Sequence, residues 1–189
     1  MFTGIVQAVG RTLSVGHRLE VAAALPRVPS VGDSVAINGC CLTHIGGEAL
    51  TFELSDETLA RTTFGRLSQN TAVNVELALR VGDPMGGHFV SGHVDCVGAL
   101  LRRESGAAGE RFTFRAPDEF AKYLVDKGSI TVDGVSLTVV EPNANDFHVW
   151  LIPHTLESTT LGQMREGSEV NLEFDLLARY VERILIYRP

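Results

Sequence analysis

The chain carries the same series of motifs twice, and this internal repeat constrains its fold more than any other feature. Four segments of the first half match four segments of the second half in the same order: 2–10 with 90–98, 35–43 with 130–138, 52–65 with 149–162, and 73–76 with 170–173. Within them, 16 of 36 aligned residues are identical, whereas chance would give roughly two. A repeat of about 90 residues is too long for a solenoid unit and suits a small domain. The sequence therefore predicts two similar domains that arose by duplication.

Short β-strands are predicted throughout each repeat. Polar and apolar residues alternate in NVELAL and NLEFDL, and SITVDGVSLTVV is rich in β-branched residues, as is typical of strands. Asn38-Gly39 and Asp133-Gly134 favour tight turns with positive φ. Evenly spaced short strands predict a barrel or sandwich in each half. Helical turns are expected in ETLARTT, in HTLESTT and in the segment 117–125, which begins with Pro117 and acidic residues.

The last segment, 175–187, has helical periodicity. Charged residues fall on one side, and apolar residues recur on the other: Leu176, Leu177, Tyr180, Val181, Ile184 and Leu185. An amphipathic helix that follows two barrels either covers a barrel surface or pairs with copies of itself. Asp175 precedes the helix and is expected to cap it, although a role in a functional site stays open.

Composition excludes several classes of function. The formal net charge is −7, and the sequence lacks the clustered Lys and Arg that phosphate binding requires, so we expect no nucleic-acid partner. No apolar run approaches the roughly 20 residues of a membrane span. The first residues, MFTGIVQAVG, lack the basic and apolar regions of a signal peptide. These features predict a cytoplasmic protein that does not bind membranes.

The cysteines and histidines give weak signals on their own. An odd number of cysteines, two of them adjacent, makes a poor disulfide framework. Adjacent strand residues point to opposite faces, so at most one of Cys40 and Cys41 can face a given pocket. Cys40 and Cys96 are expected in the core. His88, His93 and Cys96 suggest a metal site, but the spacing of the two histidines places them on opposite faces of a regular strand, so no metal site is predicted.

Six motifs together identify a known family. They are MFTGIV at the N-terminus, NGCCLT at 38–43, GGHFVSGHVD at 86–95, KGSITVDGVSLTV at 127–139, LIPHTLESTTLG at 151–162 and VNLEFDLLARYVER at 170–183. In these motifs the chain resembles the α-type riboflavin synthases from Met1 to about Arg183. The resemblance implies an all-β fold of two tandem six-stranded Greek-key β-barrels related by internal duplication, plus a C-terminal α-helix. The expected domains are 1–88, 89–174 and, for the helix and oligomerisation, 175–189.

The resemblance also implies a reaction and an assembly. Two molecules of 6,7-dimethyl-8-ribityllumazine exchange a four-carbon unit and give riboflavin and 5-amino-6-ribitylamino-uracil, without a metal or redox cofactor. The family is typically homotrimeric, with the paired site formed between barrels of different subunits. Association with lumazine synthase is a further expectation. A different class, the lumazine-binding antenna proteins, shares the duplicated barrel but does not turn substrate over.

The two repeats differ where chemistry would need them to differ. Cys41 is matched by Ser136, Ile5 by His93 and Asn38 by Asp133. The C-terminal copy has thus gained His93, Asp133 and Ser136, while the N-terminal copy keeps Cys41, and which lumazine each residue serves stays open. The dismutation requires loss of a proton from the C7 methyl of one lumazine and attack at C7 of the other.

By resemblance, the catalytic candidates are Phe2, Cys41, His93, Lys127, Asp133 and Ser136. His93 is the candidate proton shuttle, because its reference pKa lies near neutrality, and Ser136 or Cys41 is the candidate nucleophile. The expected substrate-binding residues are Gly4, Ile5, Val6, Leu42, Thr43, Thr58, Gly92, Val94, Leu137, Thr138 and Thr155. Strand-and-turn packing alone is the alternative reading of the repeated Thr and Gly residues.

Overall fold

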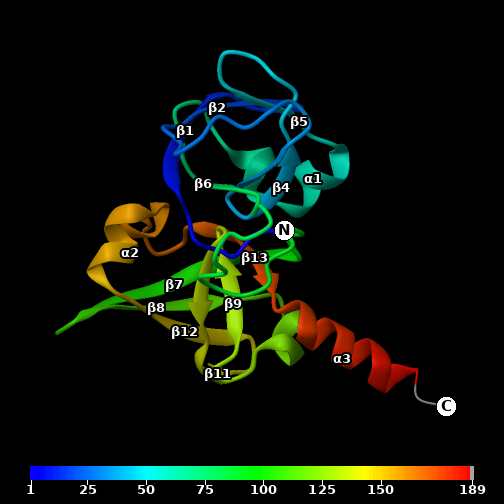
Figure 1. The fold of residues 1–189 in the computed structure, drawn as a ribbon. Helices are drawn as coiled ribbons and strands as arrows, with labels where there is room; N and C mark the ends of the chain where they lie inside the picture. The colour runs from blue at the N-terminus through cyan, green and yellow to red at the C-terminus, as the bar shows by residue number, and fades with distance from the viewer. Residues whose placement is uncertain (188–189) are drawn as a thin grey trace.

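Two closed antiparallel sheets follow one another along the chain in the computed structural model, which describes residues 1–187 (Figure 1). The N-terminal sheet has the order β4-β3-β6-β1-β2-β5, and its end strands β4 and β5 contact each other. Its strands are β1 (Ala8–Ser14), β2 (Arg18–Ala22), β3 (Ser34–Ile37), β4 (Cys40–Thr43), β5 (Leu50–Glu53) and β6 (Ala72–Leu77). The predicted all-β fold of two barrels is confirmed.

The C-terminal sheet repeats this order with one additional strand. Its order is β10-β9-β13-β7-β8-β12-β11, and β10 contacts β12. The strands are β7 (Cys96–Gly106), β8 (Gly109–Arg115), β9 (Ser129–Val132), β10 (Val135–Thr138), β11 (Val140–Asn143), β12 (Asp146–Leu151) and β13 (Glu169–Phe174). Seven strands replace the expected six because the stretch from β10 to β11 changes partner at Val139, from β9 to β12.

The connections contain short helices at matching places in the two halves. α1 (Asp56–Arg61) and η1 (Thr63–Arg66) correspond to α2 (Pro153–Ser158) and η3 (Thr160–Gln163). Ser55 caps α1 by accepting a hydrogen bond from the backbone N–H of Thr58. The segment expected to be a helix near Pro117 is the 3₁₀ helix η2 (Asp118–Tyr123).

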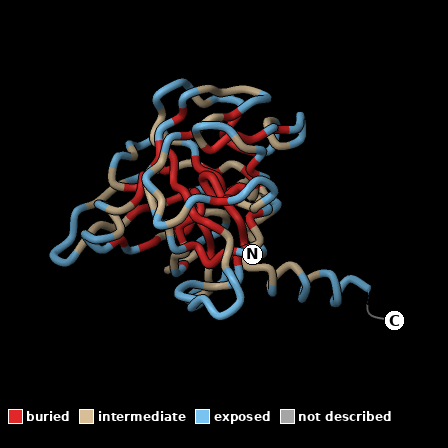
Figure 2. Tube along the Cα trace, turned by 45° about the horizontal axis from the view of Figure 1, so that its top comes forward, coloured by how far each residue is buried: buried red, intermediate tan, exposed pale blue. Residues whose placement is uncertain are grey.

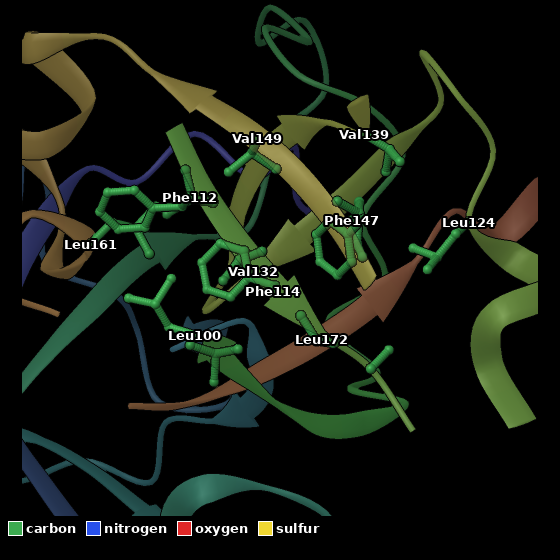
Figure 3. Packing of buried hydrophobic residues seen from close by; sticks show 14 of the residues in the cluster. Leu100, Phe112, Phe114, Leu124, Val132, Val139, Phe147, Val149, Leu161 and Leu172 are labelled. Carbon is green, nitrogen blue, oxygen red and sulfur yellow. The ribbon is translucent and has the colours of Figure 1, made fainter. Parts of the chain in front are cut away.

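Each barrel has its own hydrophobic core. The inward-facing residues of alternating strands fill the barrels, as the period of two requires. In the C-terminal barrel Phe112, Phe114 and Phe147 are fully buried, and the rings of Phe114 and Phe147 stack with centroids 5.6 Å apart (Figure 3). Cys40 and Cys96 lie in the two cores as expected.

The C-terminal helix α3 (Leu176–Ile186) projects away from both barrels (Figures 1 and 2). Asp175 caps it as predicted, because its side chain accepts a hydrogen bond from Leu177 N. Arg179 pairs with Asp95 at 3.0 Å. The apolar stripe does not cover a barrel: Leu177, Tyr180, Val181, Ile184 and Leu185 are all more than half exposed in the single chain. Among residues 1–187, no helix is long and apolar enough to cross a membrane.

A pseudo-twofold junction joins the two barrels. Asn171 receives a hydrogen bond from Thr63 N (2.8 Å) and donates one to the backbone oxygen of Asn38 (2.9 Å). Asn74 of the first repeat makes the two equivalent contacts to the second repeat. It accepts a hydrogen bond from Thr160 N and donates one to the backbone oxygen of Asp133. The turns at Gly39 and Gly134 meet back to back, since a Cβ on either would lie within 3 Å of the other's backbone. The two buried asparagines therefore satisfy backbone groups across the junction, although the hydroxyls of Thr63 and Thr160 beside them have no hydrogen-bond partner within residues 1–187.

Candidate functional site

Cys41 lies against a segment of the opposite repeat. Its backbone N–H donates to the oxygen of Gly92 at 2.8 Å. A Cβ on Gly92 would be only 2.6 Å from the Cβ of Cys41, and Gly92 has φ +79, so only glycine suits this contact. Cys41, Thr58, Gly92, His93 and Val94 line one cavity of about 240 Å³, which also includes residues of α1.

Ser136 is related to the N-terminal segment in the same way. Its backbone N–H donates to the oxygen of Gly4 at 2.8 Å, and a Cβ on Gly4 would lie 2.6 Å from the Cβ of Ser136. Val6 packs on the C-terminal core, whereas Val94 packs on the N-terminal core. The two segments therefore exchange places, and each site has walls from both repeats.

The exchange decides which catalytic candidates lie together. His93 belongs to the C-terminal repeat, but it lines the cavity that contains Cys41 of the N-terminal repeat. The physical reason is that residues 91–94 leave their own barrel and lie on β4 of the other. Sequence alignment matches equivalent residues between the repeats, and it cannot report which barrel a segment contacts.

Two buried glutamates hold the exchanged segments in place. Glu76 accepts hydrogen bonds from the backbone N–H groups of Thr3 (2.8 Å) and Gly4 (3.0 Å). Glu173 accepts them from Ser91 (2.7 Å) and Gly92 (2.9 Å). Burial raises the pKa of both carboxyl groups, and the backbone donors oppose that rise. Each carboxylate thereby fixes the glycine that contacts Cys41 or Ser136.

Asp133 lies at the junction between the barrels. It has φ +46, and its side chain accepts a hydrogen bond from Asn171 N at 2.8 Å. Asn38 has φ 43 and accepts the equivalent bond from Asn74 N at 2.7 Å. Burial raises the pKa of Asp133 to about 7. The predicted turns with positive φ are confirmed, and the carboxyl group occupies a position where the other repeat has an amide.

His88 is a site residue that sequence reasoning missed. Its Nδ1 atom is 2.7 Å from the Oγ of Ser136. Burial lowers the pKa of His88, and the negative charge of Asp175 opposes that effect. The sequence signal was the GGH motif that precedes His93, but His88 was considered there only as a metal ligand. No cluster of three or more metal-ligating side chains occurs among residues 1–187.

The other residues predicted for the site lie in different places relative to Cys41 and Ser136. Phe2 is fully buried and bridges to Val90, beside Ala36 and Cys41. Lys127 is exposed in a turn with φ +64. None of the following residues lines the cavity that contains Cys41, although some flank Cys41 or Ser136 on the same strand: Ile5, Leu42, Thr43, Leu137, Thr138 and Thr155. Leu42 and Leu137 pack in or against the barrel cores.

The glutamates and the junction asparagines were visible in the sequence but received no role. VNVE and VNLE keep Asn and Glu in both copies. Two polar residues that recur inside strands point to buried hydrogen bonding, because a buried polar group needs a partner. The partners could not be found from the pattern: the asparagines bind the opposite repeat, and each glutamate binds a segment more than 70 residues away in its own repeat.

Comparison with known proteins agrees with this architecture. A family model for the lumazine binding domain matches residues 3–78 and again 91–175. The chain is 41% identical to the riboflavin synthase of Photobacterium phosphoreum over 98% of this chain and 89% of that one. It is 42% identical to the riboflavin synthase of Mycobacterium tuberculosis (strain ATCC 25618 / H37Rv) over 98% of each. The chain belongs to the riboflavin synthase family. It is accordingly an enzyme of the transferase class.

A solved structure resembles the whole fold. The crystal structure of LumP complexed with riboflavin superposes with a TM-score of 0.82 and covers 93% of this chain and all of that one, at 23% identity. At this identity the likeness concerns the fold, which is the same pair of barrels. The identification of the family rests on the full-length relatives.

Proposed function

We propose that this protein converts two molecules of 6,7-dimethyl-8-ribityllumazine to riboflavin and 5-amino-6-ribitylamino-uracil. The observation that carries the proposal is a pair of pseudo-equivalent sites with different reactive groups, a thiol at Cys41 and a hydroxyl at Ser136. A dismutation uses two identical molecules in different roles, one as donor and one as acceptor. Two sites with similar walls and unlike chemistry meet that requirement.

The proposed roles follow the chemistry of the two activations. His93, beside Cys41, is the candidate for moving a proton at the C7 methyl of one lumazine. Ser136 is the candidate nucleophile at C7 of the other, and Cys41 the alternative. Replacement of His93 by alanine should slow exchange of the C7-methyl protons of bound lumazine into deuterated water, as followed by NMR. An unchanged exchange rate would remove His93 from proton transfer.

Turnover of lumazine alone tests the function directly. The purified chain should form riboflavin from 6,7-dimethyl-8-ribityllumazine in the presence of a chelator, with no flavin or nicotinamide added. Absorbance and chromatography would identify riboflavin and the uracil product in equal amounts. Lumazine bound tightly with no riboflavin formed would contradict the proposal.

The second candidate function is binding of a lumazine or flavin without turnover. The similarity of the fold to LumP complexed with riboflavin favours it. The presence of Cys41, His93 and Ser136 in the motifs of the synthase resemblance argues for catalysis instead. The turnover experiment separates the two.

Assembly and location belong to the same proposal. The exposed apolar stripe of α3, with the adjoining groove between η2 and α3, is suited to contact another copy of the chain, and we propose a homotrimer. A cytoplasmic location, an association with lumazine synthase and the domain limits 1–88, 89–174 and 175–189 stay predictions. Sedimentation of the purified chain, alone and with lumazine synthase, tests both associations.

A further inference from the structure

A histidine outside the expected catalytic set contacts the reactive hydroxyl of the C-terminal site. The Nδ1 atom of His88 lies 2.7 Å from the Oγ of Ser136, a short hydrogen bond between two partly buried side chains. A neutral imidazole with its proton on Nε2 presents Nδ1 as an acceptor. In that form the Ser136 hydroxyl donates to His88.

The fold fixes His88 at this place through its backbone. The chain on either side is tied to the N-terminal segment: His88 N donates to Thr3 O at 3.2 Å, and Phe2 N donates to Val90 O at 2.8 Å. A Cβ at Gly87 would lie 2.0 Å from Thr3 O and 2.9 Å from the Cβ of Ser136. No larger residue fits at position 87, so the loop packs directly on Ser136 and directs the imidazole toward it.

The surroundings suit a group that takes up a proton briefly. Burial lowers the pKa of His88, so the resting imidazole is neutral near pH 7. Asp175, which caps α3, is the charged group that acts on His88, and its carboxylate favours the imidazolium. A neutral acceptor with a carboxylate nearby is the arrangement in which a histidine activates a hydroxyl nucleophile.

We propose that His88 is the general base that activates Ser136, an inference that rests on the proposed function. As Oγ bonds to C7 of the acceptor lumazine, a ring π bond breaks and its electron pair is delocalised over the ring. The hydroxyl proton passes to Nδ1 of His88. When Oγ later leaves C7, the electron pair returns to that oxygen and the imidazolium returns the proton, so the pair is regenerated without another reactant.

The chain contains a matched pair that serves as control. His148 Nδ1 is 2.9 Å from the Oγ of Thr113, between β12 and β8, and burial is the largest cause of the lowered pKa of His148 as well. Neither residue belongs to the proposed sites. Replacing His148 by asparagine should leave turnover unchanged.

A double-mutant cycle tests whether His88 acts through Ser136. His88→Asn keeps a polar atom near the position of Nδ1 but cannot accept a proton at neutral pH. It should lower kcat by roughly 10²–10⁴-fold, the usual value of general base catalysis, while lumazine binding changes little. Adding His88→Asn to Ser136→Ala should cause no further loss, because the two residues act as a unit. Full activity of His88→Asn, or losses that multiply, would overturn the proposal.

A measurement that does not depend on turnover completes the test. Nitrogen-15 NMR of the wild-type chain with labelled histidine should show His88 at pH 7.5 with the proton on Nε2 and an unprotonated Nδ1. A protonated Nδ1 would mean that His88 donates to Ser136, and the base role would be refuted. Absence of riboflavin from the wild-type chain would refute the proposed function instead, so the two failures are distinguishable.

Discussion

Asp133→Asn should stabilise the protein, and the gain should depend on pH. Asp133 is 5% exposed between the barrels, and burial raises its pKa from 3.8 to about 7. The folded state therefore binds this proton over a pH range in which the unfolded state has lost it. Stability falls as pH rises from about 4 to 7, because the folded protein must accommodate a buried carboxylate. The cost is fully present above the folded pKa.

The magnitude follows from the difference between the two pKa values. A rise of roughly three pH units corresponds to about 4 kcal/mol above pH 7. An amide at this position removes the titration and keeps the contact, since Asn38 already accepts the equivalent hydrogen bond, from Asn74 N at 2.7 Å. Asp133→Asn should thus be more stable than wild type by up to about 4 kcal/mol at pH 8 and nearly equal to it at pH 4.

Urea unfolding at several pH values, with the free energy extrapolated to water, measures this difference. Asn38→Asp is the matched control: it places a carboxyl in the same turn of the other repeat, where Asn38 is 5% exposed. It should destabilise the protein at pH 8 and have little effect at pH 4. A constant difference between wild type and Asp133→Asn from pH 4 to 8 would refute the reasoning. Loss of turnover in a stabilised Asp133→Asn variant would assign the carboxyl a role in the reaction.

Three further perturbations test the contact at Cys41, the junction between the barrels and the helix α3. Gly92→Ala should displace Cys41 and lower turnover. Gly32→Ala is the control: with φ +91 and no atom within 4 Å of the added Cβ, it should lower stability only through backbone strain and leave turnover unchanged. Urea unfolding measures the loss of stability, and activity assays measure turnover. Asn171→Ala leaves Thr63 N and a buried carbonyl without a partner, so it should cost roughly 2–4 kcal/mol in urea unfolding. Val181→Asp with Ile184→Asp should yield monomers by ultracentrifugation that bind lumazine but do not form riboflavin; a fully active monomer would contradict a site shared between subunits.

The sequence predicted the parts of the fold that depend on local pattern. The strands β6 and β13, the turns at Asn38 and Asp133 and the cap of α3 all follow from residues adjacent in the chain, although β6 and β13 are buried on both faces rather than on alternate residues. Duplication then predicted two similar domains, and the family resemblance implied that both are barrels. The change of partner at Val139 was not predictable, because a strand that bends between two neighbours has the same periodicity as a straight one.

The sequence predicted most of the candidate site residues but not which of them lie together in space. The repeats identified Cys41 and Ser136 as unlike residues in like positions. They gave no sign that His93 lies with Cys41 or that His88 lies with Ser136, because both contacts depend on segments that cross between the barrels. Long-range placement of this kind arises from buried partners such as Glu173, whose donors are about 80 residues away in the chain.

The two repeats share the glycines that position their segments but differ in their reactive side chains. Asp133, at the junction between the barrels, is an exception, because it is a structural position that also differs. Glycine at 4 and 92 is required by contacts that no Cβ could enter, so these positions cannot diverge. Cys41 and Ser136 differ although their backbone N–H groups make equivalent hydrogen bonds, to Gly92 O and Gly4 O. Asp133 lies in the junction, yet it differs from Asn38 in the first repeat, and its raised pKa predicts a cost of about 4 kcal/mol above pH 7. An amide would accept the same hydrogen bond without the free-energy cost of burying a charge, so packing alone gives no reason for a carboxyl group there. A buried acid that weakens the fold is therefore a candidate for function, as expected of groups with strongly perturbed pKa values.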